Sequence, residues 1–75
     1  MYEYLDTCEA IITSRTKEAA YVDILAPIKT SGICFDSLNL REGSIIQGTV
    51  IWVPEVEDVG RRTVIKFDSS VGALM

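Results

Sequence analysis

The sequence predicts a small all-β domain, and three observations support that fold class. Apolar and polar residues alternate over short segments, which is the pattern of half-buried strands. Polar stretches that contain glycine or proline separate these segments, as the turns of a compact β-domain do. The chain has 75 residues, of which 48% are hydrophobic, so we expect one folded domain over residues 1–75 rather than disorder.

The first two expected strands are joined by a polar turn. Residues 6–14 form the first strand, in which Cys8, Ala10 and Ile12 share one face. Residues 14–19, "SRTKEA", are typical of a turn. Residues 20–25 form the second strand, and Pro27 ends or bends it because proline cannot donate a hydrogen bond to a sheet.

The third and fourth expected strands follow with a short connection between them. Residues 29–35 form the third strand, and the connection has room for one helical turn capped by Asp36 or Ser37. Residues 44–53 form the longest strand. Gly48 lies inside it and predicts a tight bend or a bulge, as at the corner of a barrel.

Trp52 lies near the end of the fourth expected strand, and a fifth strand follows it. Regular alternation puts Trp52 on the same face as Val50, so we expect its indole in the core. Residues 61–68 form the last strand, with every second residue from Thr63 facing inward. The tail, residues 70–75, is expected to fray.

Five short, mostly antiparallel strands favour a closed Greek-key barrel, because closure hides most of the strand edges. The OB-fold is the five-stranded barrel of this size, and it is the predicted architecture. A small SH3-like barrel is the alternative.

Composition argues against several functional classes. The chain has no histidine and carries a net charge of −4, and no set of residues has the spacing of a catalytic constellation. Cys8 and Cys34 are too far apart in sequence for a zinc or redox motif, so we expect buried thiols, no metal and no cofactor. There is no apolar run of ~18 residues, which argues against a membrane span. The first residues do not resemble a secretion signal, so we expect a cytoplasmic protein. Because no catalytic constellation is found, we also expect that it is not an enzyme.

Three segments carry a resemblance to a known family: "GICFDS" at residues 32–37, "EGSIIQGTVI" at 42–51 and "VGRRTVIKFDS" at 59–69. In this order the chain resembles an S1-type RNA-binding domain, from about Glu9 to Ser69. The resemblance implies an OB-fold that binds single-stranded RNA. One departure from the family pattern is Glu18, which stands where the family has an aromatic residue.

The candidate RNA-binding residues are two aromatic side chains and four cations. Tyr21 and Phe35 match stacking positions of the family and would stack on bases. The cations, which would contact phosphates, are Lys17, Arg61, Arg62 and Lys66. The sequence therefore predicts weak binding of single-stranded RNA with little base specificity.

A protein-interaction or assembly module is the alternative function. The same barrel would then bind a partner protein or a second copy through an exposed apolar patch. The residues expected in that patch are Leu25, Ile45, Ile51 and Val53.

Overall fold

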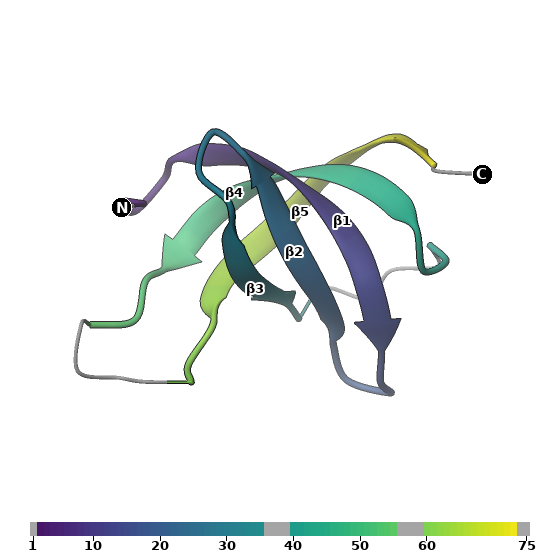
Figure 1. Ribbon diagram of the computed structural model, residues 1–75, viewed down its shortest axis with the longest axis horizontal. Helices are drawn as coiled ribbons and strands as arrows, with labels where there is room; N and C mark the ends of the chain where they lie inside the picture. The colour runs from purple at the N-terminus through teal and green to yellow at the C-terminus, as the bar shows by residue number, and fades with distance from the viewer. Residues whose placement is uncertain (1, 36–39, 56–59, 74–75) are drawn as a thin grey trace.

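The computed structural model describes residues 2–35, 40–55 and 60–73, and these residues form five β-strands (Figure 1). The strands are β1 (Thr7–Arg15), β2 (Ala20–Ala26), β3 (Thr30–Cys34), β4 (Ser44–Trp52) and β5 (Thr63–Ala73). The helical turn expected at Asp36 or Ser37 lies outside the described residues. Within the described ranges, no helix has the length and apolar character that crossing a membrane requires.

The strands close into a barrel in the order β1, β2, β3, β5, β4. β3 and β5 run parallel, and the other neighbouring strands pair in antiparallel fashion. The predicted all-β, five-stranded barrel is therefore confirmed, as a small barrel of the OB-like or SH3-like kind. Because β5 lies between β3 and β4, the connection from β3 to β4 bypasses a strand, as a Greek key requires.

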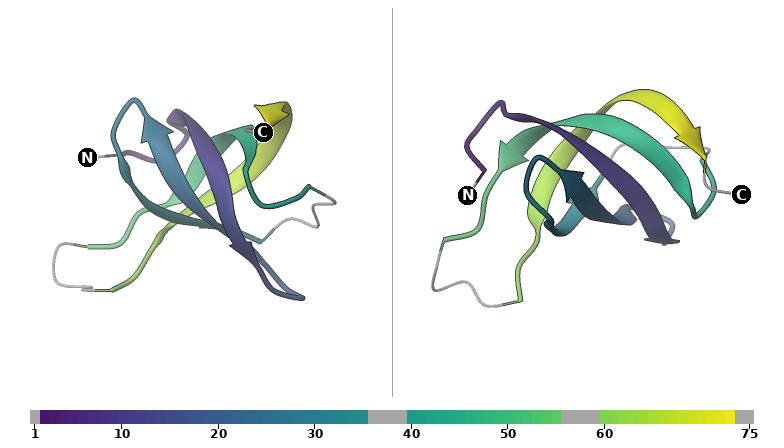
Figure 2. Two further views of the ribbon diagram at one scale, coloured as in Figure 1. Left: turned by 45° about the vertical axis from the view of Figure 1, so that its right-hand side comes forward. Right: turned by 45° about the horizontal axis from the view of Figure 1, so that its top comes forward.

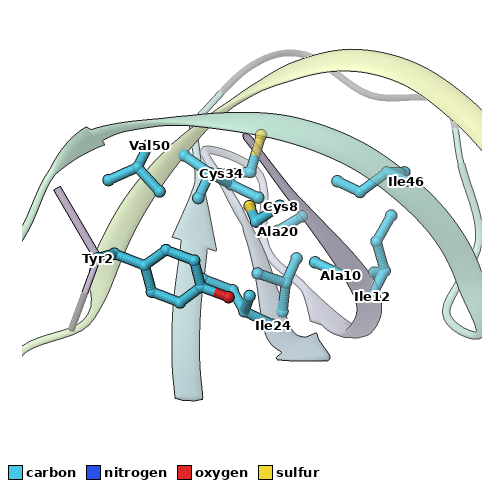
Figure 3. Close-up of a cluster of buried hydrophobic side chains, with 11 residues drawn as sticks. Tyr2, Cys8, Ala10, Ile12, Ala20, Ile24, Cys34, Ile46 and Val50 are labelled. Carbon is cyan, nitrogen blue, oxygen red and sulfur yellow. The ribbon is translucent and has the colours of Figure 1, made fainter. Parts of the chain in front are cut away.

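The alternation predicted for the strands agrees with the observed core. Inward side chains of all five strands form one apolar cluster (Figure 3). Its members are Tyr2, Cys8, Ala10, Ile12, Ala20, Val22, Ile24, Cys34, Ile46, Val50 and Ile65. Phe67 is partly buried against this cluster, as the predicted inward face of the fifth strand requires.

The environment of Trp52 corrects the sequence prediction. β4 alternates regularly as far as Val50, which is fully buried. The register then shifts, so that Trp52 rather than Ile51 is opposite Val64 on β5. One extra residue in a strand is a β-bulge, and it inverts the alternation beyond it. Trp52 is therefore 40% exposed on the outside of the barrel, whereas Val53, expected on the surface, packs against the core.

Gly48 allows β4 and β5 to approach closely. A Cβ atom on Gly48 would lie 2.8 Å from the backbone oxygen of Lys66 and 3.1 Å from Cδ1 of Ile65. The pairing with β5 also shifts register between Gln47 and Gly48. The irregularity predicted from this glycine is therefore confirmed, and its physical reason is backbone contact that leaves no room for a side chain.

β5 is longer than the sequence predicts. The expected strand ends at residue 68, whereas β5 continues to Ala73 and pairs along its length with β4 (Figure 2). Residues 70–73, for which the sequence predicts fraying, therefore belong to the sheet. Residues 74–75 lie outside the described part of the chain.

Tyr2 closes the end of the barrel at which β1 begins. Its ring points into the core cluster (Figure 3), and its hydroxyl contacts the turn between β2 and β3. The Tyr2 hydroxyl donates to the carbonyl oxygen of Ile28 at 2.6 Å and accepts from the Ile28 N–H at 2.8 Å. Burial raises the pKa of Tyr2 above its ordinary value, although the hydrogen bond to Ile28 opposes that shift.

Candidate nucleic-acid interface

A row of side chains crosses the outer face of four neighbouring strands. Tyr21 on β2 is opposite Ile33 on β3, and Ile33 is opposite Val64 on β5. Val64 is in turn opposite Trp52 on β4. Residues directly opposite each other in a sheet share a face, so Tyr21, Ile33, Val64 and Trp52 form one continuous row, called the outer row below.

Arg62 joins the outer row at Tyr21. Its Cζ atom lies 4.9 Å from the centroid of the Tyr21 ring, which is the geometry of a cation–π contact. Nη1 of Arg62 also donates to the carbonyl oxygen of Gly32 at 3.3 Å. These two contacts hold the guanidinium across β2 and β3. Two of the predicted site residues are thus brought together by direct contact.

This stack changes the part that Tyr21 can play. The predicted interface has bases stacking on Tyr21 itself, but its ring is half-buried and one side faces the guanidinium. A planar guanidinium is also a stacking surface for bases. Tyr21 and Arg62 are both half-buried, and the guanidinium covers one side of the Tyr21 ring.

Phe35 and Lys66 lie on the same outer face, beyond the outer row in the direction in which β3 and β5 run. Phe35 directly follows the buried Cys34, points away from the core and is 58% exposed. Lys66 directly follows Ile65, the partner of Cys34 across the parallel pair, and is also exposed. An exposed aromatic ring and an exposed ammonium group thus both come directly after the paired residues Cys34 and Ile65.

Lys17 and Arg61 lie in connections rather than in the sheet. Lys17 is exposed in the turn between β1 and β2, where the Thr16 hydroxyl accepts hydrogen bonds from the N–H groups of Glu18 and Ala19. Its neighbour in that turn is the acidic Glu18. Arg61 is exposed just before β5. Neither residue shares the outer row with Tyr21. Of the other two predicted cations, Lys66 lies on β5, and Arg62 directly precedes that strand and contacts Tyr21.

Two carboxylates share this face with those cations. Asp23 is exposed on β2, two residues along from Tyr21 and on the same side. Asp68 follows Lys66 by two residues on β5, and its Oδ2 atom accepts a hydrogen bond from the Thr49 hydroxyl at 2.5 Å. Acidic and basic side chains are therefore mixed on this face.

Trp52 is the site residue that sequence reasoning misses. Regular alternation assigns it to the core, and only the bulge at Ile51 turns it outward. The preceding glycine indicates an irregular strand but does not show where the extra residue falls. The bulge itself therefore has no clear signal in the sequence.

The two cysteines show no sign of chemistry at this face. Cys8 and Cys34 are both buried as thiols in the core, as predicted. Burial raises the pKa of the Cys8 thiol, and the nearby Asp68 carboxylate raises it further, so the reactive thiolate is disfavoured. The described part of the chain contains no group of three or more residues suited to holding a metal ion.

Comparisons of the chain with protein-family models, curated proteins and solved structures found no match.

Proposed function

We propose that this domain is a non-catalytic module that binds single-stranded RNA weakly on the outer face of β2, β3, β4 and β5. The observation that supports this most directly is the Arg62 guanidinium held over Tyr21, with Trp52 at the far end of the same row. Exposed Phe35 and Lys66 extend the surface along the strands. The resemblance to S1-type domains favours RNA as the ligand.

Stacking supplies most of the binding energy in this mechanism. Bases stack on Phe35, on Trp52 and on the outward plane of Arg62, and each stack contributes roughly 1–3 kcal/mol. Arg62 and Lys66 neutralise neighbouring phosphates. A total of ~4–7 kcal/mol corresponds to a dissociation constant of about 10 μM to 1 mM. Base specificity is low, because every base has a face on which to stack.

The single tryptophan of the chain provides a direct assay. A base that stacks on Trp52 quenches its fluorescence, so titration with a single-stranded oligouridine RNA should give saturable quenching. Phe35→Ala should weaken binding by about fivefold or more, because one stack is lost. Ile28→Ala changes an exposed apolar residue in the turn between β2 and β3 and serves as the control. The absence of quenching would refute the proposal. Equal RNA affinities for Phe35→Ala and Ile28→Ala would also refute it.

The alternative, a protein-interaction module, retains only part of its expected patch. Val53 packs against the core, and Leu25 and Ile45 are only half-exposed, so these residues offer little free surface. Ile51 is the remaining member, with 42% of its surface exposed. Any protein partner would therefore bind at the surface around Ile51 rather than across the whole expected patch.

A further inference from the structure

The segment before β1 forms a tight turn that is fixed to β4. The N–H of Asp6 donates to the carbonyl oxygen of Glu3 at 3.1 Å, which closes a four-residue turn. The Asp6 carboxylate accepts from the Glu3 N–H at 2.8 Å. The N–H of Leu5 donates to the oxygen of Val50 at 2.7 Å, and the N–H of Val50 donates to the oxygen of Asp6 at 2.8 Å. The turn is thus held rigidly against the barrel.

Leu5 adopts a backbone conformation that side chains disfavour. Its φ angle is +74°, at the third position of a turn where glycine or asparagine is the usual residue. Strain of this kind persists only where the surroundings impose it, and it is concentrated at functional sites. Burial of the leucine does not compensate for it, because the side chain is 60% exposed. The strained backbone therefore displays an apolar group to solvent.

The neighbours of Leu5 enlarge this apolar surface. Tyr4, the other central residue of the turn, is 68% exposed. Ile51, the bulged residue of β4, directly follows the Val50 to which the turn is bonded. We call Tyr4, Leu5 and Ile51 the turn patch. Glu3 is exposed, and the Asp6 carboxylate bends back to the Glu3 N–H, so two acidic residues adjoin the apolar surface.

We propose that the turn patch is a docking site for a linear segment of a partner protein that carries both apolar and basic side chains. The apolar groups of the segment would cover Leu5 and Ile51, and its lysine or arginine residues would pair with Glu3 and Asp6. A second copy of this chain fits poorly, because it would bring the same carboxylates together and each chain carries −4. RNA fits poorly for the same electrostatic reason. The proposal uses none of the outer-row residues and is independent of RNA binding.

The test begins with selection on the intact chain from a phage-displayed library of random linear peptides. The enriched sequences should combine lysine or arginine with aliphatic or aromatic residues. The best of them, made as synthetic peptides, should then be titrated against isotopically labelled protein. Amide shifts should centre on Tyr4, Leu5 and Ile51.

The variant Leu5→Gly removes the exposed side chain without disturbing the fold, so it separates the loss of peptide binding from a loss of stability. Glycine relieves the positive φ angle, so the melting temperature should stay unchanged or rise, whereas peptide affinity should fall by about tenfold or more. Val71→Ser changes an exposed apolar residue elsewhere and should leave affinity unchanged. Failure to enrich any sequence, enrichment of acidic sequences, or equal binding to Leu5→Gly would overturn the proposal. Self-association abolished by Leu5→Gly would also overturn it, by making a second copy the occupant.

Discussion

The contact between Arg62 and Tyr21 is the smallest unit of the proposed interface. Strand alternation predicts that both side chains point outward, and the structure confirms this for each. Their mutual contact was not predictable, because Arg62 precedes β5 and reaches Tyr21 only through the pairing of β3 with both strands. A single sequence does not reveal which strands are neighbours in this way.

Removing the ring beneath Arg62 should weaken RNA binding without unfolding the domain. Tyr21→Leu keeps an apolar side chain but loses the cation–π contact, so we expect a two- to fivefold loss of affinity, equivalent to ~0.5–1 kcal/mol. Tyr21→Phe keeps the ring and should bind as the original chain does. Tryptophan fluorescence titration measures both. Equal affinities for the two variants would show that the guanidinium stack has no part in binding.

Tyr2 and Cys8 predict how stability depends on pH. Burial raises the pKa of both groups, so the folded chain holds these protons more tightly than the unfolded chain does. Above pH ~8.5 the unfolded chain therefore loses protons first, and the free energy of unfolding should fall as pH rises. Urea denaturation between neutral and alkaline pH measures this fall. It should be shallower in Tyr2→Phe and in Cys8→Ala, and an increase in stability with pH would contradict the account.

At the level of single elements, β4 shows both the reach and the limit of sequence reasoning. Its existence, its inward residues and the special character of Gly48 are all predictable, because a long alternating run with one glycine has few other interpretations. The bulge at Ile51 is not predictable, because bulges arise from pairing with the neighbouring strand. One unpredicted residue is enough to exchange the environments of Trp52 and Val53.

A side chain at Gly48 should destabilise the barrel. The new Cβ atom of Gly48→Ala would meet the backbone oxygen of Lys66, which cannot move without shifting β5. Overpacking of this kind costs about 1–3 kcal/mol. Gln47→Ala, next to it on the exposed face, should change the free energy of unfolding by no more than ~0.5 kcal/mol. Urea denaturation compares the two, and equal effects would mean that β4 and β5 separate easily at this point.

For the whole molecule, five alternating segments and the turns between them were enough to predict a closed barrel. The part that Tyr2 plays in closing the barrel could not be predicted, because the segment before β1 lacks a periodic pattern that would assign it to the core. The net charge of the molecule also follows directly from the sequence. The arrangement of the charges does not, since the mixing of Asp23 and Asp68 with the cations depends on which strands face the same way.

This charge arrangement predicts a shallow salt dependence for RNA binding. Two phosphate contacts, from Arg62 and Lys66, give a log–log slope of about −1.4 for a single strand. Lys66→Ala should reduce the magnitude of the slope by ~0.7, whereas Lys17→Ala, in the turn beside Glu18, should leave it unchanged. Titrations at several salt concentrations measure these slopes. A steep slope that depends on Lys17 would place the phosphates on another surface.

The most direct test of the proposed function is an NMR titration of the labelled domain with a short single-stranded RNA at low and moderate salt. The account predicts amide and side-chain shifts that cluster on Tyr21, Phe35, Arg62 and Trp52 and that weaken as salt increases. The absence of shifts at low salt and millimolar RNA, or shifts that cluster away from the outer row, would contradict it.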